Sequence, residues 1–324
     1  LHFTIHSFPT RRSSDLNARS YHTSLMAIAE SLDLEFSEVE DWNCCGATEY
    51  FAINDLPAYA LVGRNLAIAA QQNGHEKLVA PCSACFLNLK KTDHVMGEYK
   101  DINQKVNTAL EAGGLNYQPG SVSVHHLLEI IYKDVGIEAI EEHIERPLYE
   151  LRIAPYYGCL VPRPADMESF DDPEHPTSLD NLMEALGAIV VDFPLKAQCC
   201  GGHMTQISED TALELIRRLL KNADDYGADV ISTLCPMCQL NLDAYQEAVN
   251  ARFGTDYNIP ILYFTQLIGL AFGIPENQLG FGKEIVSAKA ALEKISDEPP
   301  QKKKRRRRPR RRTGLPMPTM TEEG

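Results

Sequence analysis

The chain contains no run of 18 consecutive apolar residues, and its first 16 residues lack the apolar centre of a secretory signal peptide. The first absence excludes a membrane-spanning helix, and the second favours a cytoplasmic protein. Cytoplasmic thiols stay reduced, so clustered cysteines there indicate metal ligands or redox groups rather than disulfides. A glycine-rich fingerprint for NAD or flavin is also missing, so we expect any such reductant to act through a partner protein.

Positive charge is scarce outside one segment. The 324 residues include 31 Lys and Arg against 45 Asp and Glu, for a net charge of -14. Ten of the basic residues lie in residues 302–312, which leaves the rest of the chain at about -24. The chain outside this basic segment is acidic enough to repel the phosphate groups of nucleic acids, so we expect no nucleic-acid partner. We interpret residues 296–324 as a disordered basic tail.

Cysteines, in contrast, are plentiful and fall into two sets with matched spacing. Each set has an adjacent pair followed by glycine and then, after an interval of 34 or 36 residues, a CxxC motif. The first set is Cys44, Cys45, Cys82 and Cys85. The second set is Cys159, Cys199, Cys200, Cys235 and Cys238, one cysteine more. The two sets include all nine cysteines of the chain, which leaves none for an unrelated role.

The sequence around the CxxC motifs repeats as well. Leu87-Asn88-Leu89 follows the first motif, and Leu240-Asn241-Leu242 follows the second. A short apolar segment precedes each motif, at residues 77–81 and 229–234, and helical spacing follows it. We therefore expect each CxxC motif at the carboxyl end of a buried strand, where open α/β sheets form their ligand sites.

Strand and helix patterns alternate through the chain. Helices are predicted over 58–73 and 209–225, with two more that end at Gly136 and Gly273, and strands over 34–40, 150–155 and 188–193. This alternation predicts an α/β fold of two tandem, pseudo-symmetric domains with mostly parallel sheets and flanking helices. We place the domains at 17–146 and 147–295, each large enough to bury its own core. Residues 1–16 are interpreted as an artefactual or disordered N-terminus.

The adjacent pairs favour a metal centre larger than one ion. Thiolate is a soft ligand that suits zinc, copper(I) and iron–sulfur centres. Neighbours such as Cys199 and Cys200 point to opposite sides of an extended backbone, so a single zinc would need a strained turn, whereas a core of several irons accepts both. The glycines after each pair let the backbone approach such a core. A structural zinc in the four-cysteine first set remains an alternative, and disulfides or a thioredoxin-like pair are less favoured.

Together these motifs identify a family. The two ordered cysteine sets resemble the cysteine-rich CCG domain of the B subunit of heterodisulfide reductase, from about Asn17 to Glu293. The resemblance rests on these segments: Asp41-Trp42-Asn43-Cys44-Cys45-Gly46, Ala80-Pro81-Cys82-Ser83-Ala84-Cys85, Pro155-Tyr156-Tyr157-Gly158-Cys159 and Gln198-Cys199-Cys200-Gly201-Gly202-His203.

The resemblance implies a catalytic subunit that reduces a disulfide, such as the coenzyme M–coenzyme B heterodisulfide, between two noncubane [4Fe-4S] clusters. In that family each cluster has five cysteine ligands, so the second set would hold one cluster complete. The first set would supply four of five ligands, with the missing one near residues 9–15, which leaves its cluster doubtful and zinc an alternative. Implied partners are an iron–sulfur C subunit and a flavin-containing A subunit or an equivalent electron donor.

Two further side chains are candidates for roles beside the clusters. His203 is a candidate proton donor because it lies three residues after Cys200. Lys196 is expected to be a solvated lysine, or else to tune the cluster potential by its charge. Two other functions stay open at this point, namely an electron-relay subunit of another oxidoreductase complex and a structural zinc protein.

Overall fold

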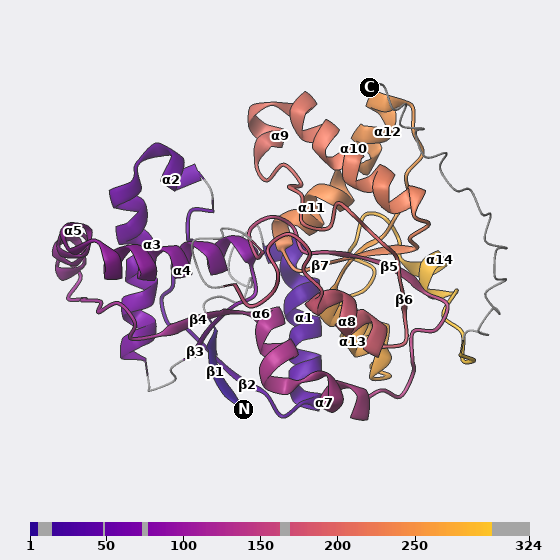
Figure 1. The fold of residues 1–324 in the computed structure, drawn as a ribbon, viewed down its shortest axis with the longest axis horizontal. Coiled ribbons are helices and arrows are strands. Elements are labelled where there is room, and N and C mark those ends of the chain that lie inside the picture. The colour runs from indigo at the N-terminus through magenta and orange to yellow at the C-terminus, as the bar shows by residue number, and fades with distance from the viewer. Residues whose placement is uncertain (6–14, 48, 73–76, 163–168, 300–324) are drawn as a thin grey trace, which may run out of the picture.

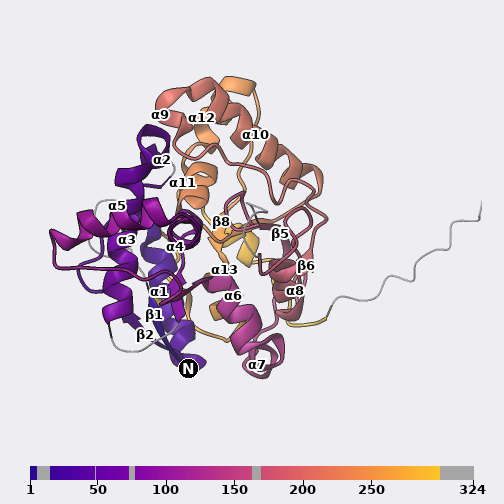
Figure 2. The same ribbon diagram turned by 60° about the vertical axis from the view of Figure 1, so that its left-hand side comes forward.

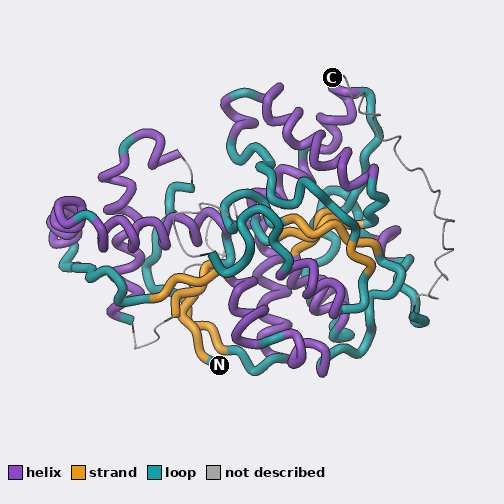
Figure 3. The backbone as a smooth tube through the Cα atoms, viewed as in Figure 1, coloured by secondary structure: helices purple, strands orange, loops and turns teal. Residues whose placement is uncertain are grey.

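The computed structural model describes residues 1–5, 15–47, 49–72, 77–162 and 169–299. In these residues the strands form two four-stranded sheets, one in each half of the chain (Figures 1 and 3). The strand order is β2-β1-β3-β4 in the first sheet and β6-β5-β7-β8 in the second, and all neighbours run parallel. The two orders are the same when each half is counted from its own first strand. The predicted α/β repeat with parallel sheets is therefore confirmed.

The first half alternates strands and helices. Its strands are β1 (His2–Ile5), β2 (Glu35–Glu38), β3 (Lys77–Ala80) and β4 (Ser123–His126). Its helices are α1 (Asp15–Ser31), α2 (Glu49–Ile53), α3 (Asp55–Gln71), α4 (Ser83–Glu98), α5 (Lys100–Glu111), α6 (Leu127–Glu129), the π-helix η1 (Ile130–Val135) and α7 (Ile137–Glu142). The central strand β3 is buried over its last three residues, as a strand covered on both faces should be.

The second half follows the same plan. Its strands are β5 (Arg152–Tyr156), β6 (Ile189–Val190), β7 (Val230–Thr233) and β8 (Ile261–Tyr263). Its helices are α8 (Ser178–Ala185), α9 (Met204–Ile207), α10 (Glu209–Asp225), α11 (Pro236–Ala244), α12 (Gln246–Phe253), α13 (Phe264–Ala271), the 3₁₀ helix η2 (Glu276–Gln278) and α14 (Lys289–Leu292). Strand β7 is buried along its whole length.

Most of the elements predicted from the sequence are present. The helices expected over 58–73 and 209–225 are α3 and α10, and the apolar segments before the CxxC motifs are β3 and β7. The helix expected to end at Gly136 is one α-turn followed by the π-helix η1, and Gly136 has a φ of 86°. Strands β1, β4 and β8 were not predicted, because they are short and, unlike β3 and β7, have no CxxC motif after them to mark where they end.

Both ends of the chain differ in part from expectation. The prediction of disorder for residues 1–16 is wrong for residues 2–5, because β1 pairs with β2 and β3 inside the first sheet. Ser296, assigned to the tail, forms a bridge with Tyr149. Residues 6–14 and 300–324 lie outside the described residues. The division of the chain near residue 146 falls between α7 and β5 and stays a prediction.

The halves interlock through their helices. Helix α1, which follows the first strand of the first half, packs on α13, which follows the last strand of the second half. The equivalent contact with the halves exchanged joins α8, after the first strand of the second half, to η1, after the last strand of the first half. Asn181 of α8 donates a hydrogen bond to the Tyr132 hydroxyl of η1 at 2.9 Å. Figures 1 and 2 show α1, α6, α8 and α13 gathered between the two sheets. One hydrophobic cluster therefore includes residues of both halves, and the expectation that each domain buries a core of its own is only partly met.

Aromatic stacking lies at the centre of this shared core. The rings of Tyr21 in α1 and Tyr263 in β8 stack with their centroids 4.3 Å apart, and each side chain is 1% exposed. The Tyr21 hydroxyl donates to the carbonyl of Pro81, the residue before the first CxxC motif, at 3.2 Å. Tyr21 thus connects the core between the halves directly to the segment that carries Cys82.

Among the described residues, no helix combines the length and the apolar character that crossing a membrane would require.

Candidate functional site

All nine cysteines line one cavity of about 390 Å³ at the junction of the two halves. Eight of them come from corresponding places in the two repeats, namely the adjacent pairs and the segments after β3 and β7, and Cys159 comes from the segment after β5. Most of the other described lining residues are apolar, and they include Trp42, Tyr157, Leu160 and Met237. The structure therefore brings together every cysteine selected from the sequence.

The two CxxC motifs meet at the centre of this cavity. Cys82 is the N-cap of α4 and Cys235 is the N-cap of α11, so each CxxC motif lies where a strand gives way to a helix, as predicted. Cys82 packs against the hydrophobic cluster of the second half that includes Cys235, so the two motifs lie close together across the junction. Helix N-termini favour negative charge, but of the two only Cys235 has a lowered pKa, whereas the contact with Cys235 and burial raise the pKa of Cys82.

Within each half, the adjacent pair lies against the CxxC motif. The Sγ atoms of Cys45 and Cys85 are 3.2 Å apart in the first half, and those of Cys200 and Cys238 are 3.5 Å apart in the second. All nine cysteines are free thiols. Gly158 has a φ of 69°, and a Cβ there would lie 3.2 Å from the Cys238 Sγ, so glycine lets the Cys159 loop approach the second set.

The thiols influence one another's ionisation. A hydrogen bond from Cys159 lowers the pKa of Cys199 to about 6, and the same contact, together with burial, raises the pKa of Cys159. Hydrogen bonds from Cys238 and Cys82 lower the pKa of Cys235. Neighbouring thiols in an apolar cavity cannot all ionise, because their negative charges repel. A metal centre would remove this conflict, since its positive charge stabilises several thiolates at once.

The donor set fits a centre of several atoms. Among the described residues, no three His, Cys, Asp or Glu side chains are close enough together to hold a single metal ion. The thiols surround a larger space instead, and soft thiolates around an apolar cavity suit iron–sulfur chemistry. The second half offers five such donors and the first half four.

Sheet register indicates where the missing fifth donor would lie. Ile5 pairs with Val79 in the first sheet, and Pro155 pairs with Ser232 in the second, which is the corresponding position. Cys159 lies four residues after Pro155, and the same step from Ile5 leads to Pro9. Proline offers no ligand atom, and position 9 lies outside the described residues.

The turn after each cysteine pair encloses a buried asparagine. In the first half Asn88 donates to the carbonyl oxygens of Cys45 and Ala47, at 3.1 and 2.5 Å. In the second half Asn241 donates to those of Cys200 and Gly202, at 3.4 and 2.7 Å. Both asparagines belong to the repeated Leu-Asn-Leu sequence after the CxxC motif. Sequence reasoning noted that repeat but assigned it no role.

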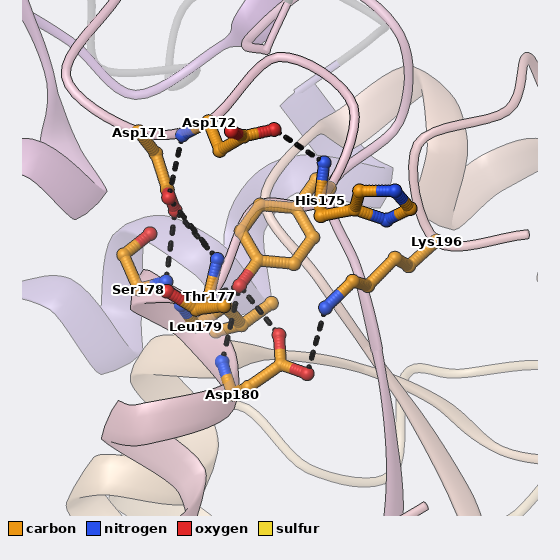
Figure 4. A network of polar contacts seen from close by, with 9 residues as sticks. Asp171, Asp172, His175, Thr177, Ser178, Leu179, Asp180 and Lys196 are labelled. Carbon is orange, nitrogen blue, oxygen red and sulfur yellow. Dashed lines mark hydrogen bonds and ion pairs between the residues drawn. The ribbon is translucent and has the colours of Figure 1, made fainter. Parts of the chain in front are cut away.

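A second network, of hydrogen bonds and an ion pair, holds the loop that follows β5 and includes Cys159 (Figure 4). The Tyr157 hydroxyl donates to Asp180 at 2.6 Å and accepts from the Leu179 amide at the start of α8 at 2.7 Å. Lys196 forms an ion pair with Asp180 at 2.9 Å, and its carbonyl accepts from the Tyr157 amide. The Lys196 side chain is only 17% exposed, so the prediction of a solvated lysine is wrong. It ties the segment before Cys199 to the one before Cys159.

His203 lines the cavity and forms an ion pair with the first half. Its Nδ1 contacts Oε1 of Glu49, the first residue of α2, and both side chains are partly buried. Glu49 was missed by sequence reasoning, because no local pattern predicts a contact between residues 154 positions apart. Ser83 was missed too: it lies between Cys82 and Cys85 and lines the cavity with a buried hydroxyl that has no hydrogen-bond partner.

Comparison with known proteins supports the same grouping. The model of the CCG cysteine-rich domain matches twice, at residues 10–90 and 153–243. The chain is 33% identical to the 8-methylmenaquinol:fumarate reductase membrane anchor subunit of Wolinella succinogenes, over 82% of this chain and 91% of that one. It is 32% identical to the B subunit of the ferredoxin:CoB-CoM heterodisulfide reductase of Methanosarcina mazei, over 82% and 88%.

A solved structure shares the fold. A hypothetical protein from Helicobacter pylori superposes with a TM-score of 0.69 at 16% identity, over 88% of this chain. The chain spans about half (52%) of that protein, and the likeness concerns the fold alone. The paired domain matches, the relatives over most of the length and the nine convergent thiols agree with one another. The chain therefore belongs to the CCG cysteine-rich family of iron–sulfur oxidoreductase subunits, together with the B subunit of heterodisulfide reductase.

Proposed function

We propose that this protein is the catalytic iron–sulfur subunit of a heterodisulfide reductase-like complex, which reduces a disulfide to two thiols. One observation carries the proposal: the thiols of two repeats converge on one apolar cavity, and Cys82 of the first half packs against the hydrophobic cluster of the second half that includes Cys235. Cys159, Cys199, Cys200, Cys235 and Cys238 would hold one [4Fe-4S] cluster. Cys44, Cys45, Cys82 and Cys85 would hold a second cluster, or a zinc ion in its place.

Bound iron–sulfur centres supply single electrons. Reduction of a disulfide consumes two electrons and two protons and yields two thiols, so the chain has to bind the S–S bond between its halves and deliver protons to it. The aromatic and aliphatic lining, with Trp42, Tyr157 and Met237, would pack on the carbon chains of the substrate and exclude water. A partner such as an iron–sulfur C subunit, fed by a flavin-containing A subunit or its equivalent, would supply the electrons.

His203 would deliver one of these protons. Glu49 holds Nδ1 of the ring, so Nε2 is the nitrogen that would pass a proton to the departing sulfur. We expect His203→Gln to lower kcat by roughly a hundredfold, with a smaller change in KM and no loss of iron. The assay is disulfide reduction with a dye reductant over a range of pH.

Glu49→Gln is the companion variant. It keeps a hydrogen-bond acceptor beside Nδ1 but removes the charge of the ion pair, so kcat should fall less than in His203→Gln while iron content stays constant. A wild-type profile for His203→Gln would exclude His203 as the donor.

Metal analysis combined with EPR tests the proposed function. We expect about eight irons per chain if both sites hold clusters and about four if only the second does. A paramagnetic signal should appear when the oxidised protein is treated with a thiol, because a thiol is the product at the site. Iron without a thiol response would favour electron relay, and zinc without iron would contradict both functions.

Electron relay is the second candidate. The Wolinella relative is named as the membrane anchor subunit of an 8-methylmenaquinol:fumarate reductase, a complex whose name includes a quinol. None of the described residues that line the cavity is Lys or Arg, and an apolar lining also suits a quinol. A chain that takes electrons from a reduced quinone but fails to reduce any disulfide would support this candidate.

A further inference from the structure

Each half of the molecule contains a buried asparagine one helical turn after its CxxC motif. We propose that Asn88 and Asn241 are positioning residues, which hold the turn after each cysteine pair in the shape that retains a cluster and tunes its reduction potential. The inference rests on the proposed function in one respect, that clusters bind at these turns. The hydrogen bonds by which Asn88 and Asn241 hold the turns do not depend on cluster binding.

The two contacts correspond atom by atom. One side-chain amide donates to two carbonyl oxygens, that of the second cysteine of the pair and that of the residue two positions later. An amide NH₂ group has two protons, one for each carbonyl, and in the second half the longer contact to the Cys200 carbonyl shares its proton with the Cys200 Sγ. Asn88 is 4% exposed and Asn241 is 1% exposed. An amide buried so deeply is costly unless it is paired, so these contacts are required by the fold at each turn.

Both turns use backbone with positive φ values, and the first turn is strained because one of these residues is not glycine. Ala47 has a φ of 46°, a conformation that costs a residue with a Cβ about 1 kcal/mol or more. In the second turn Gly201 and Gly202 have φ values of 97° and 54°. Left-handed residues turn the two carbonyls toward one side of the chain, where the asparagine binds both. Loss of that donor would remove two hydrogen bonds from each turn.

Each asparagine also connects the two kinds of cysteine. Asn88 lies on α4 and Asn241 on α11, the helices whose N-caps are the first cysteines of the CxxC motifs. A single side chain therefore fixes the cysteine pair relative to the CxxC motif. In the second half the Asn241 Nδ2 also lies 3.5 Å from the Cys200 Sγ. Hydrogen bonds to ligand sulfur raise the reduction potential of an iron–sulfur centre, because they stabilise the extra negative charge.

The chain offers matched controls for both residues. Asn107 binds both backbone groups of Tyr117, donating to its carbonyl at 3.0 Å and accepting from its amide at 2.8 Å. Asn250 does the same with Tyr257, with both distances 2.8 Å. Both hold a loop as Asn88 and Asn241 do, one in each half, but neither lines the cavity. Substitution of Asn107 or Asn250 therefore measures the effect of losing a loop contact away from the cavity.

The test replaces each asparagine with aspartate, which has nearly the same shape but loses the NH₂ donor and repels the two carbonyls. In the reconstituted chain we expect Asn241→Asp to lose roughly half of the iron and the thiol-dependent EPR signal. In Asn241→Ala, iron that is retained should show a more negative midpoint potential. Asn88→Asp should lose the metal of the first half and keep that signal. Asn107→Asp and Asn250→Asp should match the wild type in both readouts.

Alkylation of the metal-free chain separates this inference from the proposed function. Asn241→Asp should let a thiol reagent reach Cys199 and Cys200 several times faster than in Asn250→Asp, at equal helix content by circular dichroism. If the wild type binds no iron, the proposed function fails while this comparison still tests the asparagine. Equal alkylation rates would overturn the inference, as would wild-type iron and potential in the Asn241 variants.

Discussion

Cys238→Ser should abolish disulfide reduction, with a loss of at least about a thousandfold in kcat/KM. Cys238 lies within 3.5 Å of Cys200, and its Sγ lies against Gly158 in the Cys159 loop. Serine is a hard ligand in place of a soft one, so it should not replace thiolate at an iron centre. Activity, iron content and the EPR signal should therefore all fall together.

The matched variant is Cys85→Ser, at the corresponding place in the first half. Cys85 lies within 3.2 Å of Cys45, but its set has four donors rather than five. We expect it to remove the metal of the first site while the thiol-dependent EPR signal of the second remains. If Cys85→Ser releases zinc and leaves iron unchanged, the first site is a zinc site. Full activity in Cys238→Ser would contradict the assignment of the second set.

Tyr21→Ala should destabilise the whole molecule rather than one half. The ring stacks on Tyr263 in the second half and is 1% exposed, so its removal leaves a cavity in the shared core. Losses of about 3–5 kcal/mol are usual for truncation of a buried aromatic side chain. Urea unfolding of the metal-free chain measures the effect by circular dichroism and by the fluorescence of Trp42, the single tryptophan of the chain.

Two controls accompany this variant. Met26 lies on the same helix but is 40% exposed, so Met26→Ala should change the free energy of unfolding by no more than about 0.5 kcal/mol. Tyr263→Ala changes only the second half, yet it should lower the midpoint reported by Trp42 in the first half. An unchanged Trp42 midpoint would show that the halves unfold independently.

The local sequence predicted secondary structure correctly where a segment's own residues determine whether it forms a strand or a helix. The apolar runs before Cys82 and Cys235 could be assigned to buried strands, because the residues that follow them have helical spacing and the motif marks the boundary. The same reasoning failed for His2–Ile5, since four residues give too few alternations to separate a strand from a loop. It also failed for Lys196, whose ion pair with Asp180 depends on how two loops pack.

The repeat, the parallel α/β architecture and the set of nine thiols could all be read from the amino-acid order, because they follow from spacing and periodicity along one chain. Folding in three dimensions was needed to bring the two sets into one cavity, to pack Cys82 against the core of the second half, and to place Glu49 and Asn241 against the residues around the cluster site. The reason is physical. Contacts between distant segments arise from the packing of α1 on α13 and of α8 on η1, and no local pattern encodes which buried faces will meet.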